Sequence, residues 1–244
     1  MPPDAVWDRP AVIGAMPEEI RRLTAALARP QRWTRGPFAL HRGRAFGREV
    51  TVAECGVGKV NAAALAQQLL VDGATAVVFT GVAGAVDPSL RVGDVVVSED
   101  AVQHDVDVTP LGYARGCVPG QPLAWPADAE LREAALAAAR EAARAAGSEH
   151  AVVLGRVASG DQFIADAART AALASEFGAS CTEMEGAAVA QVCARWGVPW
   201  VIVRVISDTA DFGASHDFRA FTELAAERAE AVVRGILGRL EQGA

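Results

Sequence analysis

The chain lacks the sequence features of several large classes of protein. It contains no GxGxxG or Walker loop, so neither dinucleotide nor nucleoside triphosphate binding is indicated. Its four cysteines have no CxxC spacing and no histidine at zinc-ligand distance, which argues against a metal site. No apolar stretch typical of a signal peptide opens the chain, and no apolar run approaches the length of a membrane span. We therefore expect a cytoplasmic protein without metal or cofactor, whose cysteines are small buried side chains.

Positive charge is also scarce. Lys59 is the only lysine, the net charge is −7, and no arginine cluster lines one helix face, which argues against a nucleic-acid partner. The interior holds no Pro/Ser-rich or Gly/Ser-rich linker and no internal repeat. A length of 244 residues with 51% hydrophobic composition suffices for one domain with a sizeable core. We expect a single domain over residues 1–244, with residues 1–10 as a flexible tail.

Short β-branched runs alternate with alanine-rich helical stretches. Residues 76–80 and 200–207 have the continuous apolar character of buried strands. Helical patterns cover residues 18–28 and 129–146, and Asp217 is placed as the N-cap of a long final helix. This alternation predicts an α/β fold, a three-layer α/β/α domain with a central mixed twisted sheet. In such folds ligands bind beyond the carboxyl ends of the strands, so the residues that follow each strand are the candidates for function.

Two glycine-containing segments lie at such positions. The segment 81–84 follows the strand expected at residues 76–80, where it either forms an ordinary turn or lets a ligand approach the backbone closely. The segment 56–59 precedes a helix, where backbone amides and Lys59 could bind an anion. A lysine that merely begins a helix explains the second pattern equally well.

Four charged positions each allow more than one interpretation. Glu183 and Glu185 flank a methionine at the start of an apolar helix, where they either favour the helix dipole or bind a sugar diol. Arg204 lies in a β-branched run, so it points outward or meets a carboxylate such as Glu19, because an unpaired buried arginine is costly. Asp208 ends that run and either caps the next turn or faces a ligand.

Seven short motifs follow one another along nearly the whole chain, from about residue 11 to 240. They are IGAMPEE (13–19), GVGKV (56–60), TGVAG (80–84) with VGDVVVS (92–98), HDVDV (104–108), SGDQFI (159–164), EME (183–185) and RVISD (204–208) with AD (210–211). In this order they resemble the 5′-methylthioadenosine/S-adenosylhomocysteine nucleosidases, within the nucleoside phosphorylase superfamily. The resemblance implies a nucleoside phosphorylase-like fold and hydrolysis of the N-glycosidic bond to adenine and a 5′-thioribose, without a cofactor.

The resemblance also implies catalytic roles that suit this reaction. Cleavage builds positive charge on the ribose and negative charge on the purine, so the enzyme must protonate the base, support the sugar and place a water. Asp208 would protonate adenine N7, with Ser207 holding its geometry. Glu185 would accept from the 2′- and 3′-hydroxyls, and Glu19 would orient and deprotonate the water, with Arg204 nearby as its ionic partner. An acid that holds its proton near neutral pH needs surroundings that raise its pKa, which we expect of Asp208.

The remaining implied contacts surround the substrate. Phe163 would stack on adenine, the backbone of Ile164 would read its edge, and Met184 would lie against the ribose. Around the 5′-alkylthio group and beside the ligand the resemblance places Met16, Val57, Phe218 and Gly84. In this family a neighbouring subunit closes the pocket, which implies a homodimer and here involves Val108, Leu111, Tyr113 and Pro119.

Two positions depart from the family. Val82 stands where many relatives have a serine that helps to hold the water, and the lost hydrogen bond is worth roughly 1 kcal/mol. The departure at Val82 therefore bears on the rate of the reaction and not on which reaction is catalysed. Leu111 stands where an aromatic residue is common, which would loosen the preference among 5′-substituents.

Three alternatives stay open. A purine nucleoside phosphorylase would need cations around phosphate, whereas Glu18 and Glu19 would repel it, although Arg21 and Arg22 follow closely. A nucleosidase acting on 6-amino-6-deoxyfutalosine would share the same residues. A binding module without turnover would not need three carboxylates suited to acid, sugar and water chemistry.

Overall fold

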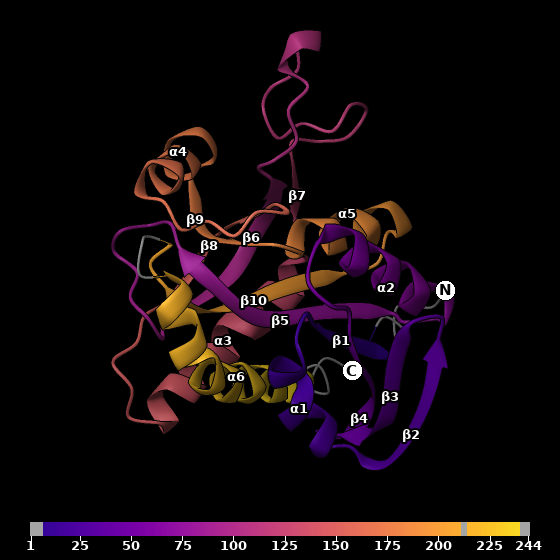
Figure 1. Ribbon diagram of the computed structural model, residues 1–244. Helices are drawn as coiled ribbons and strands as arrows, with labels where there is room; N and C mark the ends of the chain where they lie inside the picture. The colour runs from indigo at the N-terminus through magenta and orange to yellow at the C-terminus, as the bar shows by residue number, and fades with distance from the viewer. Residues whose placement is uncertain (1–6, 211–213, 240–244) are drawn as a thin grey trace.

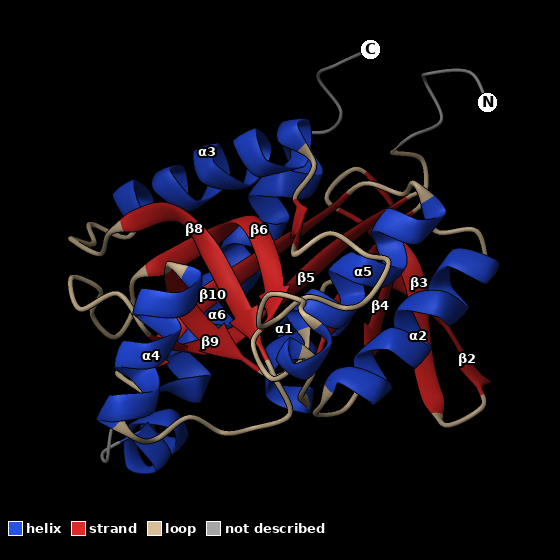
Figure 2. Ribbon diagram, turned by 90° about the horizontal axis from the view of Figure 1, so that it is seen from above, coloured by secondary structure: helices blue, strands red, loops and turns tan. Residues whose placement is uncertain are grey.

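A ten-stranded mixed sheet forms the centre of the molecule, with helices on both of its faces (Figures 1 and 2). The computed structural model describes residues 7–210 and 214–239, without the side chains of residues 214–220 and 222–224. The strands are β1 (Pro10–Gly14), β2 (Ala28–Arg35), β3 (Phe38–Ala45), β4 (Arg48–Glu54), β5 (Ala76–Ala85), β6 (Val95–Gln103), β7 (Ala124–Pro126), β8 (Val152–Ser159), β9 (Ala179–Glu183) and β10 (Trp200–Asp208). The helices are α1 (Pro17–Ala25), α2 (Lys59–Val71), α3 (Ala129–Ala145), α4 (Ala167–Phe177), α5 (Gly186–Trp196) and α6 (Ala214–Arg239), with a short 3-10 helix η2 (Thr109–Leu111).

Two apolar cores lie on opposite faces of this sheet. On one face α2 and α5 pack over side chains such as Ile13 and Phe79. On the other face α1, α3 and α6 pack over Val12, Val78 and Val203. Alternate residues of the same strands enter opposite cores because successive side chains of a strand point to opposite faces. The predicted α/β/α layering is therefore confirmed.

Part of the sheet closes on itself, which the sequence did not indicate. β10 pairs with β5 on one side and β6 on the other, and the path β6–β8–β9–β5 returns to β10. β1, β4, β3 and β2 extend outward from β5. The closed path brings β9 to one edge of β5 and β10 to the other. β9 and β10 both carry charged side chains of the site described below.

The glycines at 81–84 do not form a turn, so that interpretation was wrong. β5 continues to Ala85, and all ten of its residues are buried. Gly81 pairs with Arg204 and Gly84 with Asp208 in β10, while Gly84 also pairs with Thr182 in β9. Strand partners on both sides keep this segment extended despite its glycines.

Two predicted helix boundaries were also wrong. The helix expected over residues 18–28 ends at Ala25, and the following residues form β2, which pairs with β3. This pairing outweighs the weak helical preference of the exposed sequence. Asp217 does not cap the final helix, since α6 begins at Ala214.

The ends and the cysteines add smaller findings. Of the tail expected at residues 1–10, the part described is anchored: Arg48 donates to the Trp7 carbonyl at 2.8 Å, and Pro10 opens β1. All four cysteines are free thiols, and Cys117 is only half-buried rather than buried. Within the ranges that the structure describes, no helix is long and apolar enough to span a membrane.

Candidate active site

A cavity of about 280 Å³ opens where β1, β5, β9 and β10 end. It is lined by most of the residues that the sequence singled out: Met16, Glu19, Val57, Gly84, Phe163, Ile164, Met184, Glu185, Ser207 and Asp208. The other lining residues are Ala15, Val82, Ala83, Gln162, Thr182 and Glu183. In the described part of the chain, no three acidic, histidine or cysteine side chains gather as a metal site would require. The charged side chains of the lining are all carboxylates.

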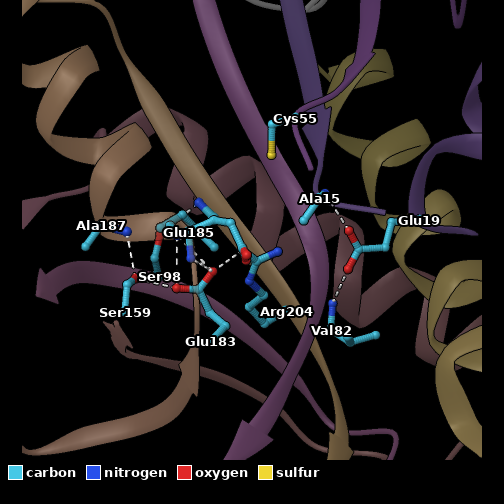
Figure 3. Close-up of polar contacts among 12 residues, drawn as sticks. Ala15, Glu19, Cys55, Val82, Ser98, Ser159, Glu183, Glu185, Ala187 and Arg204 are labelled. Atoms are coloured by element: carbon cyan, nitrogen blue, oxygen red, sulfur yellow. Dashed lines mark hydrogen bonds and ion pairs between the residues drawn. The ribbon is translucent and has the colours of Figure 1, made fainter. Parts of the chain in front are cut away.

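Glu19 lies at one end of the cavity and is fixed by backbone amides. One carboxylate oxygen accepts from the amides of Ala15 at 2.6 Å and Met16 at 3.0 Å, and the other accepts from the Val82 amide at 3.0 Å (Figure 3). Burial raises the pKa of Glu19, and the nearby Arg204 charge and these amides offset only part of that rise. A buried carboxylate with a raised pKa is suited to take up a proton.

Arg204 is buried behind the cavity, and its direct partner is Glu183 rather than Glu19. Its guanidinium also lies 4.1 Å from the centre of the Phe79 ring. Burial alone would lower the pKa of Arg204, but the carboxylates of Glu183, Glu19 and Glu185 together raise it. The predicted ion pair between Arg204 and Glu19 was therefore wrong, although the two side chains are near each other. In Figure 3 the Arg204 side chain lies between Glu183 and Glu19.

Gly81 makes this arrangement possible. A Cβ at this position would collide with the Arg204 guanidinium and with the Glu19 carboxylate. β5 lies between β9 and β10, so the Arg204 side chain must cross β5 to reach Glu183 on β9. It can do so at Gly81 because glycine has no side chain.

Glu183 also lines the cavity, although the family resemblance implied no role for it. Its carboxylate accepts from the amide of Gly186 at 2.9 Å and from that of Glu185 at 3.2 Å, and it also accepts from the Ser159 hydroxyl and from Arg204. The helix-dipole interpretation therefore applies to Glu183, which stabilises the start of α5. An arginine within a buried strand signals that some carboxylate must face it, but the spacing does not say which one.

Glu185 has a different environment from Glu183, although only Met184 separates them. It is the N-cap residue of α5, and its carboxylate accepts from the Gly58 amide at 2.8 Å. Burial, together with the neighbouring charge of Glu183, raises the pKa of Glu185 to about 8, although Arg204 opposes this shift. Burial and the Glu183 carboxylate thus disfavour a negative charge on Glu185, and a positive charge beside it would favour the ionised form.

Asp208 ends β10 opposite these groups and is 3% exposed. The Ser207 hydroxyl donates to one of its oxygens at 2.8 Å, as the sequence interpretation expected, and the Ala210 amide donates to the other at 2.9 Å. The second bond is a local turn contact, so Asp208 both caps a turn and lines the cavity. A Cβ on Gly84 would lie 2.8 Å from its carboxylate, so glycine is required at position 84.

Two apolar side chains of the lining are substantially exposed. Phe163 and Val57 are both 50% exposed beside the cavity, whereas Ile164 is buried. The side chain of Phe218, expected in the same pocket, lies outside the described residues.

The four residues expected to reach a neighbouring subunit do not line this cavity. They belong to the segment between β6 and β7, which projects from the body of the molecule (Figure 1, top). The projecting segment comprises residues 104–123. Of the four expected residues, Val108 is half-buried, and Leu111, Tyr113 and Pro119 are exposed.

Comparisons with known proteins agree with this geometry. Residues 9–238 match the model of the phosphorylase superfamily. A 5′-methylthioadenosine/S-adenosylhomocysteine nucleosidase of Geobacillus kaustophilus is 41% identical over 235 residues, covering 95% of this chain and 97% of the relative. The structure of such a nucleosidase from Neisseria meningitidis in complex with methylthio-immucillin-A has a TM-score of 0.89 and 37% identity, covering 95% of this chain and 99% of that one. A futalosine hydrolase mutant of Helicobacter pylori has a TM-score of 0.88 and 32% identity, with the same coverage of 95% and 99%.

Proposed function

The chain belongs to the 5′-methylthioadenosine/S-adenosylhomocysteine nucleosidases of the phosphorylase superfamily, and from this premise we propose the reaction and the role of each residue. The enzyme hydrolyses the N-glycosidic bond of 5′-methylthioadenosine and S-adenosylhomocysteine, releasing adenine and the 5′-thioribose. The observation that carries the proposal is one cavity with Glu19, Glu185 and Asp208 at separate positions around it. Each carboxylate suits one requirement of the reaction.

Asp208 serves the departing base as the general acid. The purine gains negative charge as the bond breaks, and a proton delivered to N7 neutralises it. The bonds from Ser207 and Ala210 fix the orientation of the carboxyl group before the substrate arrives. Phe163 stacks on the base and the Ile164 backbone binds its edge.

Glu185 and Glu19 serve the sugar. Glu185 accepts from the ribose hydroxyls, and Met184 lies against the ring. Because burial and the neighbouring Glu183 charge raise the pKa of Glu185, a developing ribosyl cation gains more from its ionised form than the neutral substrate does. Glu19 orients the water and takes its proton, and Arg204 acts on Glu19 only through its nearby charge. Met16 and Val57 enclose the 5′-alkylthio group.

Water rather than phosphate is the nucleophile. All charged groups of the described lining are carboxylates, which repel an anion. Two cations near the site are already paired with carboxylates: Arg204 with Glu183, and Lys59 with Asp105 at 2.6 Å. The alternative of a phosphate role for Lys59 therefore has no support in the geometry.

We expect added phosphate to leave the products unchanged as adenine and free methylthioribose. The measurement is a panel of 5′-methylthioadenosine, S-adenosylhomocysteine, 5′-deoxyadenosine and aminodeoxyfutalosine, each with and without phosphate, with both products identified by chromatography. A sugar 1-phosphate would move the protein to the phosphorylases. Turnover of aminodeoxyfutalosine alone would favour the second candidate, which the similarity to the Helicobacter pylori futalosine hydrolase keeps open.

The active form is a homodimer in a reducing, cytoplasmic compartment. Support comes from α2, whose outer face carries the exposed apolar side chains Val60 (79% exposed) and Val71 (59% exposed) although its inner face is already buried. A helix that is apolar on both faces calls for a second partner. Leu111 and Tyr113 on the projecting segment are exposed as well, and a second copy would use them to close the outward side of the cavity.

Introducing a charge on this face is expected to separate the subunits. Val60→Asp would bury an unpaired carboxylate in the interface and give a monomer with a raised KM, because the open pocket would no longer enclose the 5′-substituent. Light scattering and steady-state kinetics measure the two effects. Leu154→Asp, at a 40% exposed apolar residue of β8, is the matched control. A monomeric wild type, or a Val60→Asp dimer with unchanged KM, would contradict the proposal.

A further inference from the structure

Lys59 lies outside the cavity lining, yet it connects three segments that surround it. Its ammonium donates to the Asp105 carboxylate at 2.6 Å and to the Gln103 side chain at 2.8 Å, both at the root of the projecting segment. Its backbone amide donates to the Asp161 carboxylate at 2.8 Å. Side-chain exposures of 15% for Lys59 and 14% for Asp105 keep this ion pair largely away from water.

A third bond closes a ring. The Asp161 amide donates to the second oxygen of Asp105 at 2.9 Å. Lys59, Asp105 and Asp161 therefore hold one another through both backbone and side chain, and we call this set the clamp. Charge-assisted hydrogen bonds of this kind are roughly twice as strong as neutral ones.

The clamp lies directly next to the part of the site proposed to bind the base. Residues 160–164, the base loop, carry Phe163 and Ile164 two and three positions after Asp161. On the other side of Lys59, the Gly58 amide is the donor to Glu185. Two consecutive amides at the start of α2 thus have different acceptors: the Gly58 amide donates to Glu185, and the Lys59 amide donates to Asp161 in the base loop.

We propose that Lys59 is a positioning residue that holds the base loop in its adenine-binding conformation through Asp105 and Asp161. The inference rests on the proposed function. Without the ammonium, Asp105 loses its cationic partner, and only the backbone donors of the clamp still hold the base loop to the projecting segment and to α2. Contacts to adenine weaken, whereas Glu185, Glu19 and Asp208 keep their own hydrogen bonds.

The test compares Lys59→Met with Lys59→Arg and with Arg35→Met. Lys59→Met keeps the length of the side chain and removes its charge. We expect the adenine Kd and the KM for 5′-methylthioadenosine each to rise about tenfold, with kcat changed by less than about threefold, from the ordinary strength of a charged hydrogen bond. Binding of methylthioribose stays unchanged. Lys59→Arg restores most of the affinity for adenine.

Arg35→Met is the matched control, because Arg35 also pairs with an aspartate, Asp72 at 3.1 Å, but away from the cavity. It is expected to change neither constant. A loss that falls on kcat, equal losses of adenine and methylthioribose affinity, or no loss in Lys59→Met would each overturn the proposal. If Lys59→Met shows no cooperative thermal unfolding, Asp105→Asn takes its place with the same expected split between KM and kcat.

The ion pair of the clamp can also be observed directly by NMR. Since Lys59 is the only lysine, a 15Nζ-lysine label gives a single side-chain ammonium signal. Its hydrogen bonds slow proton exchange, so the signal is expected in the wild type and lost in Asp105→Asn. Failure of the proposed function is a separate outcome, namely a wild-type protein that neither hydrolyses the nucleoside nor binds adenine.

Discussion

The Asp208→Asn variant is expected to release adenine about a thousandfold more slowly, in the middle of the range for loss of a general acid. The amide can still accept from the Ala210 amide and bond to the Ser207 hydroxyl, so the local geometry of Asp208 is retained. It has no acidic proton to give to N7, and the purine must then leave as an anion. The measurement is a steady-state adenine assay, with adenine affinity determined separately.

Asp87→Asn provides the matched control for this variant. The Asp87 carboxylate makes the same kind of turn contact, accepting from the amide two residues on, Ser89, at 2.8 Å, but lies outside the cavity lining. We expect Asp87→Asn to retain normal turnover and Asp208→Asn to retain its thermal midpoint. Near-normal turnover in a folded Asp208→Asn protein would remove Asp208 from the role of acid.

Glu19→Gln is expected to lower kcat by about a hundredfold, as for loss of a general base, with KM changed by less than about twofold. The water is positioned only once the substrate is bound, so the effect falls on the chemical step. In the wild type, both carboxylate oxygens of Glu19 accept from backbone amides: one from Val82, the other from Ala15 and Met16. Glutamine replaces one of these oxygens with an NH₂ group, which cannot accept, so either the Val82 amide or the other two amides lose their acceptor. The free energy of unfolding should therefore fall by about 1–3 kcal/mol.

The pH dependence separates the catalytic effect of Glu19 from the structural one. Burial raises the pKa of Glu19, so the proton-accepting form is lost as the pH falls through this raised value. The wild-type kcat should decline on the acid side at a higher pH than an ordinary glutamate would cause. Glu19→Gln should lack the part of that decline that Glu19 causes, while the part that Glu185 causes stays in both proteins. Glu18→Gln, at the half-buried neighbour, is the control. Unchanged turnover, or a loss confined to KM, would argue against Glu19 as the base.

The sequence by itself determined the layered fold and much of the lining of the cavity. The continuous apolar runs at 76–80 and 200–207 identified β5 and β10, because strands buried on both faces carry no polar alternation. The order of the motifs indicated the family and brought Glu19, Glu185 and Asp208 into one hypothesis. These signals are local in the sequence, so each can be recognised without knowing what packs against the segment.

Only the tertiary structure decided how those residues are connected. Arg204 pairs with Glu183 rather than Glu19 because β9 and β10 lie on either side of β5 and Gly81 leaves room between them. The glycines at 81–84 stay extended because two strands pair with them, and Lys59 faces Asp105 across a separation of 46 residues. Each of these contacts depends on which strands and loops become neighbours. Such contacts between distant parts of the chain leave no periodicity in the sequence. Residue type therefore indicated that a buried Arg204 needs a carboxylate without identifying Glu183, and it did not indicate the partners of Lys59.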